Sequence, residues 1–425
     1  MRRMSTGESI TSSRTSRISW ALYDFANSAF PTVIITAVYA IYFKKVVVGM
    51  DEPGRSDSLW GIANAAAAGV VFLLAPTLGA AADIGGKKRL FLTIFTLLCV
   101  IPTGLLRTTG EGTIVWAMLL VMLSVIGFEG GLIFYNSFLP DLVDKSGMGR
   151  LSGQGWALGY IGGLGCLLAV LPLADNYLVE IPLVVASWFL VFSLPALLLL
   201  RDRRTDSAPQ RLDIERGFRQ FLTTLKNLRS YRRLFRFLVA YFFYNNAVIT
   251  IIVFAVAFSS ETLAFTTKES ILLIAAMNVV ASPGALVFGW LADRIGAKET
   301  IMITLLLWLL VVIGSEVAAW PGLFDVPAAK QVFWGVSILA SLCIGATQAV
   351  SRGFVGQLAP DNRSAEFYGF MAFAGKGSAV LGPLVFGLVS DTFDSQRAAV
   401  ATVGIFFLIG LVLLLRVPSP AERKR

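Results

Sequence analysis

Charged and amide side chains within long apolar segments are the groups of this chain that could bind or move a solute. Asp24, Asn27 and Ser28 are spaced i, i+3 and i+4, which places them on one face of a helix. Glu129 lies near the middle of a second apolar segment, and Lys376 lies about ten residues into a third, each between glycines. A charge at membrane depth costs several kcal/mol unless it is paired or hydrated. We therefore expect these residues to face the interior of a helix bundle and to contribute to binding or coupling.

Each of the three charges has a structural alternative. Asp24 lies near the start of its segment, so it could be a gate or proton site, or could only cap the first helical turn. Burial favours the neutral form of a carboxylic acid, which suits Glu129 to proton coupling, but Glu129 could also belong to a structural ion pair. Lys376 could pair with Glu129 or Asp24, or bind an anionic substrate group such as a carboxylate.

Four further polar residues lie within other apolar segments. Asn245, Asn246 and Gln348 could contact a substrate or form hydrogen bonds between helices. Arg352 is close to the end of its segment, and we expect its long side chain to extend to the membrane surface.

A polar motif, Gly-x3-Asp-x2-Gly-x-Lys, occurs twice at an offset of 210 residues, each time between two apolar segments. The two copies are Gly79, Asp83, Gly86 and Lys88, and Gly289, Asp293, Gly296 and Lys298. The first glycine of each copy allows close helix approach and the second allows a tight turn. The carboxylate can bind the N-terminus of a neighbouring helix or the lysine of its own motif. We expect two conformational latches; the simpler alternative is a turn with topology-setting lysines.

Several kinds of chemistry are not expected from this sequence. Histidine is absent, and neither a nucleotide-binding G-x4-G-K-[ST] loop nor a nucleophile–base set occurs. The cysteines lie in apolar runs, where a thiol is usually a packing residue, and they are Cys99, Cys166 and Cys343. We expect no enzyme activity, no cofactor and no metal. If the protein moves a solute across a membrane, that movement would then be facilitated or driven by an ion gradient.

The composition indicates an integral membrane protein. Hydrophobic residues make up 56% of the 425 residues and charged residues 15%, and the mean hydropathy is +0.72. Apolar runs of about 20 residues, the length of a transmembrane helix, recur without the alternation of barrel strands. The polar, arginine-bearing first 19 residues do not read as a cleavable signal peptide. We expect twelve spans near residues 20–43, 58–82, 90–107, 113–137, 151–174, 181–200, 236–258, 270–292, 300–319, 331–353, 367–390 and 397–415.

The segments between these spans differ in charge. Those on the side of the two terminal tails carry 28 Lys and Arg residues, counting those at span ends, whereas the opposite ones carry 7. Because basic loops stay in the cytoplasm, we expect both termini there, with the protein in the cell (inner) membrane. The net charge of +9 is then a topology signal, and no nucleic-acid partner is expected.

Internal repetition divides the chain into two halves. Tyr-x-Phe-x-Asn-x-Ala opens the first span at Tyr23 and the seventh at Tyr241, and Pro-Asp closes the fourth and tenth at Pro140 and Pro360. Parallel six-helix repeats are typical of transporters with a midplane site between two bundles. We expect bundles at residues 1–200 and 236–425, joined by a cytoplasmic linker at 201–235.

The linker has the pattern of an amphipathic helix. Its apolar stripe consists of Leu212, Phe218, Phe221, Leu222, Leu225 and Leu228. We expect this helix to lie on the inner leaflet, and a regulatory or partner-binding role is the alternative.

The repeated motif resembles the signature loop of the major facilitator superfamily, which lies between spans two and three and between spans eight and nine. Ile84 stands where an Arg is common in that family, whereas the second copy keeps Arg294. We therefore expect the first latch to have fewer cationic partners than the second.

Further blocks are similar to the vacuolar-effluxer-like branch of that superfamily, which is named for an autophagy-related fungal amino-acid exporter. The blocks are residues 20–30, 135–141 with 153–160, and 348–352 with 365–369 and 375–376. The resemblance covers essentially the whole chain, and its compact loops suggest a bacterial member. It implies that spans one, four, seven and ten line the cavity.

Together these patterns predict an all-α integral membrane transporter with twelve helices in two pseudo-symmetric bundles and alternating access. The resemblance implies that the substrate is a small polar solute, and export of amino acids is the first hypothesis. Protonation of Glu129, alone or coupled to Asp24, would shift the balance of conformations. The expected partners are this solute, membrane lipid and a proton. The alternatives are a transporter of a sugar, peptide or drug, and a non-transporting receptor or scaffold.

Overall fold

The computed structural model describes residues 13–49, 53–174, 176–202 and 213–418, and the elements in these residues are helical. Within them, twelve helices are long and apolar enough to cross a membrane. The predicted all-α fold with twelve transmembrane helices is therefore confirmed.

The first half contains six spans. The first span is α1 (Arg14–Asn27), which continues through a π-helical segment (Phe30–Ala37), α2 (Tyr39–Tyr42) and a second π-helical segment (Phe43–Val47). The others are α3 (Pro53–Gly85), α4 (Lys88–Leu105), α5 (Ile114–Ser137), α7 (Met148–Val170) and α8 (Ile181–Leu199), with the short α6 (Leu139–Leu142) after α5.

The second half repeats this arrangement after a connecting helix, α9 (Ile214–Lys226). Its spans are α10 (Arg232–Ala257), α11 (Thr267–Ile295), α12 (Ala297–Ala318), α13 (Val326–Leu358), α14 (Ser364–Phe393) and α15 (Gln396–Leu415).

Several helices are longer than the apolar runs that predict them. α1 begins at Arg14 instead of residue 20, and α13 continues to Leu358 instead of ending at residue 353. Hydropathy detects only the part of a helix that suits hydrocarbon, whereas polar residues inside a bundle are helical as well. Asp24 and Arg352 therefore lie deeper in their helices than expected.

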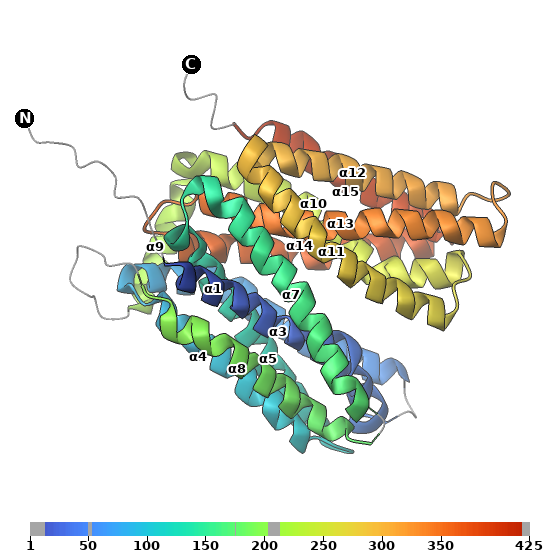
Figure 1. Ribbon diagram of the computed structural model, residues 1–425, viewed down its shortest axis with the longest axis horizontal. Coiled ribbons are helices and arrows are strands. Elements are labelled where there is room, and N and C mark those ends of the chain that lie inside the picture. Colours follow the sequence, from blue (N-terminus) through green and yellow to red (C-terminus); the bar gives the residue numbers. More distant parts are fainter. Residues whose placement is uncertain (1–12, 50–52, 175, 203–212, 419–425) are drawn as a thin grey trace, which may run out of the picture.

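The two halves meet at one end of the molecule. Figure 1 shows them together where α1 begins and α15 ends, and spreading apart at the other end. We call these the termini end and the far end. At the termini end, helices of opposite halves touch: a Cβ at Gly289 of α11 would lie 2.6 Å from the carbonyl oxygen of Gly149 of α7. A Cβ at Gly79 of α3 would collide with the backbone of Ala365 of α14. Small residues thus allow the helix contact that closes this end.

Further towards the far end, glycines of the same two helices make no close contact. Gly61 and Gly69 of α3 and Gly387 of α14 have no atom within 4 Å of the position where a Cβ would lie. Glycines of this helix pair therefore pack closely at the termini end but not at these three positions.

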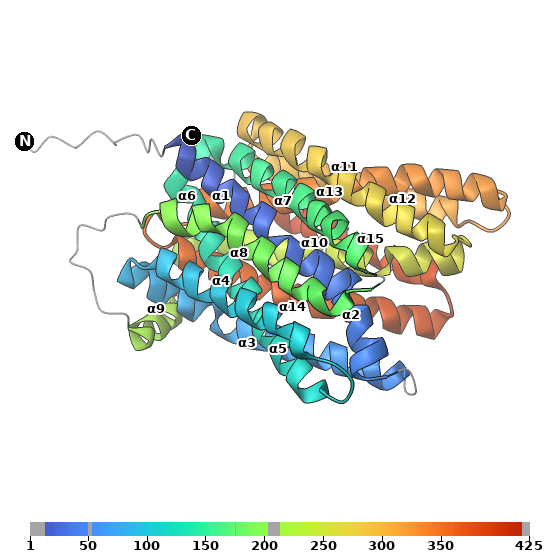
Figure 2. The ribbon, with the colours of Figure 1, turned by 60° about the horizontal axis from the view of Figure 1, so that its bottom comes forward.

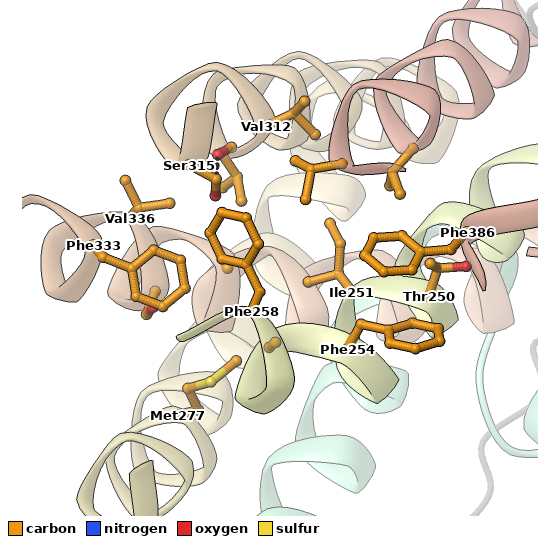
Figure 3. Close-up of a pocket in the computed structure, with 16 residues that line it drawn as sticks. Thr250, Ile251, Phe254, Phe258, Met277, Val312, Ser315, Phe333, Val336 and Phe386 are labelled. Atoms are coloured by element: carbon orange, nitrogen blue, oxygen red, sulfur yellow. Dashed lines mark hydrogen bonds between the residues drawn. The ribbon is translucent and has the colours of Figure 1, made fainter. Parts of the chain in front are cut away.

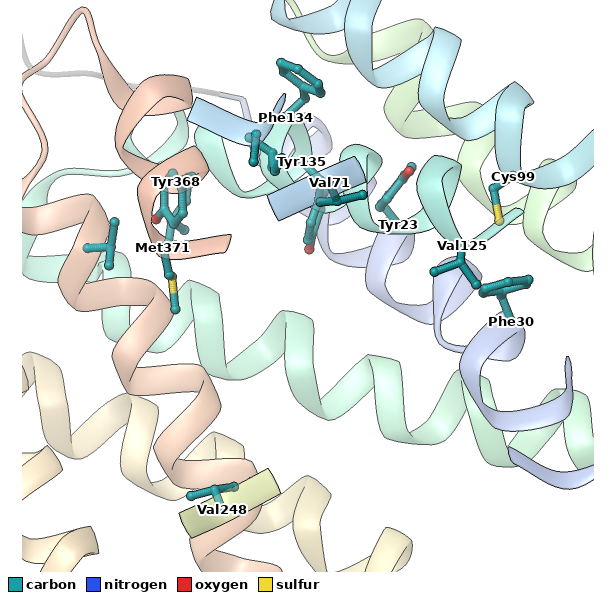
Figure 4. Close-up of a cluster of buried hydrophobic side chains, with 14 of the residues drawn as sticks. Tyr23, Phe30, Val71, Cys99, Val125, Phe134, Tyr135, Val248, Tyr368 and Met371 are labelled. Atoms are coloured by element: carbon teal, nitrogen blue, oxygen red, sulfur yellow. The ribbon is translucent and has the colours of Figure 1, made fainter. Parts of the chain in front are cut away.

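Buried aromatic side chains fill the core of each half. Trp20 stacks on Tyr135 with ring centroids 4.6 Å apart, and Trp308 stacks on Phe407 at 5.2 Å. Figure 4 shows part of the cluster, including Tyr23, Tyr135 and Phe30. The cysteines are buried and free, as expected of packing residues, and they are Cys99, Cys166 and Cys343.

The connecting helix α9 packs against protein as well as facing outward. Gly217 of α9 lies against the backbone of Thr77 in α3, and Phe221 contacts Phe370 of α14 at a centroid distance of 5.6 Å. Phe218 on the same helix remains exposed. The expectation that α9 lies on the leaflet surface is therefore incomplete, because α9 also packs against helices of both halves. Residues 203–212, including Leu212, and the side chain of Leu228 lie outside what the structure describes.

Candidate functional site

A cavity of about 300 Å³ lies between the two halves. Its walls come from α1, α5 and α7 on one side and from α10, α13 and α14 on the other. Six of the seven predicted substrate or coupling residues line it, namely Asp24, Asn27, Glu129, Asn245, Gln348 and Lys376. The structure thus brings together residues that are distant in the sequence, and all but Lys376 come from the predicted spans one, four, seven and ten.

Glu129 and Lys376 form an ion pair across the cavity. Lys376 Nζ of α14 lies 2.5 Å from Glu129 Oε1 of α5, so the pair joins the two halves. The side chains are 24% and 18% exposed, which makes them accessible from the cavity. Of the predicted partners for Lys376, Glu129 is the one that the structure shows.

The glycines beside Glu129 serve the packing of a neighbouring helix. A Cβ at Gly127 would collide with the backbone of Cys99 in α4, and one at Gly130 would collide with the ring of Phe95. These glycines hold α5 against α4 and thereby direct Glu129 to the opposite face, towards the cavity.

Asp24 and Arg352 form a second ion pair between the halves. Arg352 Nη1 of α13 lies 2.8 Å from Asp24 Oδ2 of α1, and both side chains are less than one-tenth exposed. The prediction that Arg352 extends to the membrane surface is wrong. The alternative that Asp24 only caps the first turn fails, because α1 starts almost three turns earlier and the carboxylate binds Arg352.

Arg352 is held by more than its carboxylate partner. Its Nε donates to Ser152 Oγ at 2.8 Å and its Nη2 donates to the Ser152 carbonyl oxygen at 2.7 Å. The guanidinium also lies over the ring of Trp20 at 4.8 Å and near that of Trp156 at 5.5 Å. Acceptors and aromatic faces on α1 and α7 compensate the burial of this charge, so the side chain has no need to reach the surface.

The amide side chains divide between cavity and packing. Asn245 Nδ2 donates to Ser378 Oγ at 2.6 Å, and Gln348 Nε2 donates to Asn245 Oδ1 at 3.3 Å, so these two amides connect α10, α13 and α14. Asn27 is buried beside the cavity, and among the described residues its Nδ2 has no acceptor. An unpaired buried donor of this kind is uncommon in proteins.

Asn246 does not line the cavity, contrary to its predicted role. Its Nδ2 donates to the carbonyl oxygen of Phe242 in its own helix, and its backbone packs against Gly382 of α14. One residue further along a helix turns the side chain by about 100°, which separates Asn246 from Asn245.

At the termini end, the first repeated motif binds the other half. The carboxylate of Asp83 accepts hydrogen bonds from the backbone N–H groups of Glu366 at 2.8 Å and Ala365 at 3.3 Å, at the N-terminus of α14. Lys88 Nζ lies 3.9 Å from Asp83, and it binds Asp141 at 2.8 Å and Ser364 Oγ at 2.7 Å. The carboxylate therefore interacts both with a helix N-terminus and with the lysine of its own motif.

The second repeated motif makes the matching contact. Asp293 accepts from the backbone N–H groups of Gly149 at 2.8 Å and Arg150 at 3.0 Å, at the N-terminus of α7. Lys298 instead donates to the carbonyl oxygen of Leu415, and Arg294 stacks over Trp290 of its own helix. The expected inequality is not seen, because each aspartate has one cation within 4 Å. Asp83 has the lysine of its own motif, whereas Asp293 has Arg150 of α7, whose Nε lies 3.8 Å from Asp293 Oδ2.

The turns of both motifs require glycine. Gly86 has φ +60° and Gly296 has φ +107°, a backbone region that side chains with a Cβ rarely adopt. The predicted tight turns are present in both copies.

Comparison with known proteins gives the family. The family model described as "Vacuole effluxer Atg22 like" matches residues 12–425. The chain belongs to the Atg22-like vacuole effluxer family. This Atg22-like protein is 29% identical to the uncharacterized MFS-type transporter YxiO of Bacillus subtilis, over 94% of each chain. It is 25% identical to autophagy-related protein 22-1 of Penicillium rubens over 63% of this chain, and the match spans about half (49%) of that longer relative.

Solved structures place the Atg22-like protein in the major facilitator fold. A bacterial homologue of the iron transporter ferroportin in an outward-facing state matches with a TM-score of 0.71 and 14% identity, covering 95% of this chain and 98% of that one. The human organic anion transporter MFSD10 matches with a TM-score of 0.71 and 17% identity, covering 94% and 99%. At such identities the likeness shows the fold alone. With the family, it makes this protein a major facilitator transporter and not an enzyme.

A second cavity of the Atg22-like protein is much more apolar than the cavity between the halves. It occupies about 50 Å³ inside the second half, where Phe254, Phe258, Phe333 and Phe386 surround it (Figure 3). No charged residue lines this space, so it is a gap in hydrophobic packing and does not suit a polar solute.

Sequence reasoning missed the partners that hold Arg352 in this Atg22-like protein. Ser152 and Asn136 accept from its guanidinium, and Trp20 and Trp156 flank it. Trp20, Asn136 and Trp156 lie in the blocks that carry the family resemblance, and their presence there was the one feature of the sequence that could have pointed to them. Their connection to Arg352 depends on the packing of α1, α5 and α7 against α13.

Proposed function

We propose that this protein is a proton-coupled secondary transporter that exports a small polar solute, with amino acids as the first candidates. The observation that carries the proposal is a polar cavity in which two ion pairs, Asp24–Arg352 and Glu129–Lys376, join the two halves. Rocking of the halves about this cavity has to break or exchange both pairs. A group that alters either pair therefore alters the balance between conformations.

The charge bias of the loops supports an orientation. Under the positive-inside rule, the termini end faces the cytoplasm of a cell (inner) membrane. The contacts of Asp83 and Asp293 then close the cavity on the cytoplasmic side. The halves spread at the far end, so the described conformation corresponds to an outward-facing one (Figure 1).

Glu129 is the better candidate for the proton. Its pair with Lys376 is partly exposed to the cavity, whereas the Asp24–Arg352 pair is almost fully buried. Protonation of Glu129 removes the negative partner of Lys376 and leaves a cation at membrane depth. That cation can then bind an anionic group of a substrate, and loss of the proton restores the pair.

The cavity also supports a small zwitterionic substrate. Lys376, once protonation of Glu129 frees it, can bind a carboxylate, and the neutral carboxyl group of Glu129 can still accept a hydrogen bond from an ammonium group. A volume of about 300 Å³ is at the lower end of the range for ligand pockets, roughly 300–1,000 Å³. Both features favour an amino acid over a peptide or a drug-sized molecule.

Flux measurements in proteoliposomes test this function. The purified protein is reconstituted, and uptake and efflux of a broad amino-acid panel are followed with and without a pH gradient. We expect at least one amino acid to accumulate against its gradient when a pH gradient is imposed. If no member of the panel moves under either condition, the amino-acid proposal fails.

The Glu129→Gln variant tests proton coupling. This variant should lose accumulation driven by the pH gradient and keep counterflow exchange, because exchange needs no net proton movement. The matched control is Glu316→Gln, since Glu316 pairs with Arg397 at 3.3 Å, is similarly exposed (23%), and has its partner in the same half. Unchanged accumulation in Glu129→Gln, or equal loss in Glu316→Gln, would refute the assignment.

A further inference from the structure

A groove of about 520 Å³ lies on the outside of the bundle between α1, α7 and α11. Figure 2 shows these three helices side by side. Ile18, Ile161 and Leu286, one from each helix, are each about half exposed in its walls. The groove shares no lining residue with the central cavity, and its volume is within the range for ligand pockets.

The groove is charged at only one of its ends. Arg14 and Arg17 lie in its lining at the start of α1, on the helical face that continues to Ile18 and Ala21. Both arginines are exposed, and the residues further in are apolar except for Gln154 and Ser282. None of the lining residues is acidic.

A third cation lies at the same end. Arg150 is one helical turn before Gln154 on α7, so it shares the face that lines the groove. Its side chain is 60% exposed and its Nε lies 3.8 Å from Asp293 Oδ2. The groove thus has a basic end at the level where the spans begin and an apolar interior at the depth of the hydrocarbon.

We propose that this groove binds one anionic phospholipid, with its phosphate at Arg14 and Arg17 and an acyl chain along α7 and α11. Basic pockets between transmembrane helices bind acidic head groups through charge. The apolar walls supply the second contribution, because the methylene groups of a lipid chain gain from contact with a shaped surface. The charge at one end fixes which way the lipid lies.

The lipid would lie across the joint between the two halves. α1 and α7 belong to the first half and α11 to the second, and Ser282 of α11 donates to the carbonyl oxygen of Ala157 at the floor of the groove. Beneath the basic end, Gly289 packs on Gly149. A lipid that contacts all three helices is therefore expected to bind best when the termini end is closed.

Native mass spectrometry of the purified full-length protein tests the site. The protein in detergent is mixed with phosphatidylglycerol and phosphatidylcholine of identical acyl chains, and retained lipid is counted. We expect one retained phosphatidylglycerol in preference to phosphatidylcholine. The double variant Arg14→Gln/Arg17→Gln should bind it roughly 30-fold more weakly, as the loss of two favourable cation contacts predicts.

Two further variants separate the site from general surface charge. Arg229→Gln/Arg232→Gln removes two exposed cations at the same end of the molecule but away from the groove, and it should leave lipid retention unchanged. Ile161→Trp fills the groove without changing its charge and should reduce retention of phosphatidylglycerol. Each variant is compared for thermal unfolding without added lipid, and phosphatidylglycerol should raise the unfolding temperature of the wild type most.

The outcomes are decisive in either direction. Equal retention of the two lipids by the wild type would overturn the proposal. So would an equal loss in the Arg229/Arg232 control, because the attraction would then be general surface electrostatics. Undiminished retention in Ile161→Trp would show that the acyl chain does not occupy the groove. These results do not depend on transport, so they stand apart from the test of function.

Discussion

Replacing Asp24 with Asn should shift the protein towards a conformation that is open at the termini end. The substitution keeps the shape of the side chain and removes the negative charge that lies 2.8 Å from Arg352 Nη1. Because Asp24 is in the first half and Arg352 in the second, the ion pair exists only while the halves are together. Its loss therefore destabilises the closed state and leaves the free energy of the open state unchanged.

The size of the shift follows from what Arg352 retains. Removing one partner of a buried ion pair costs about 3–5 kcal/mol when the other charge is left uncompensated. Here the guanidinium keeps both oxygens of Ser152 and the indole faces of Trp20 and Trp156. We therefore expect a net change of about 2 kcal/mol, the value of one hydrogen bond to a charged group. That change is about 30-fold in the ratio of closed to open molecules.

Distances between spin labels measure this ratio. Arg201→Cys and Arg416→Cys place labels at exposed positions beyond α8 and α15, one in each half at the termini end. Asp24→Asn should increase the longer-distance population, whereas Glu316→Gln, whose ion pair lies within one half, should not. An unchanged distribution in Asp24→Asn, or an equal change in the control, would refute the view that this ion pair holds the halves together.

Two further predictions concern packing and pH. Gly79→Ala places a Cβ against the backbone of Ala365 and should disfavour the closed state by about 1–3 kcal/mol, seen as a longer distance between the same labels, whereas Gly387→Ala, with open space, should not. Burial raises the pKa of Asp202, whose carboxylate accepts from the backbone of Arg89. Folding then favours its protonated form, so wild-type stability should fall as pH rises from about 4 towards that higher pKa. The unfolding temperature of Asp202→Asn should lack this fall, and identical pH profiles would contradict the prediction.

Much of the candidate site could be predicted because charges at membrane depth are rare. Asp24, Glu129 and Lys376 stand out against apolar neighbours, and all three line the cavity. Their pairing could not be predicted in the same way. Asp24 and Arg352 are 328 residues apart, and Glu129 and Lys376 are 247 apart, so each contact depends on how two bundles pack.

The predictions for Arg352 and Asn246 were wrong for related reasons. The apolar run of α13 stops near residue 353, which makes Arg352 look superficial, but the helix continues through residues that are buried against the other half. Asn246 is adjacent to Asn245, yet the helical rotation between them decides which one reaches the cavity. The repeated motifs predicted where two contacts between the halves lie. The groups that bind Asp83 and Asp293 are backbone N–H groups, which cannot be recognised from residue type.

The contacts of Asp83 and Asp293 are reciprocal between the halves, and this has a consequence for the origin of the chain. The aspartate in the last turn of the second span of each half binds the start of the fifth span of the other half, so the contact is the same in both directions. That is the isologous arrangement of a homodimer with twofold symmetry. A symmetric dimer of six-helix units would already contain both contacts, and gene fusion would preserve them. Because the recipients are peptide groups, Ala365 and Glu366 could diverge from Gly149 and Arg150 while the contact stayed in place.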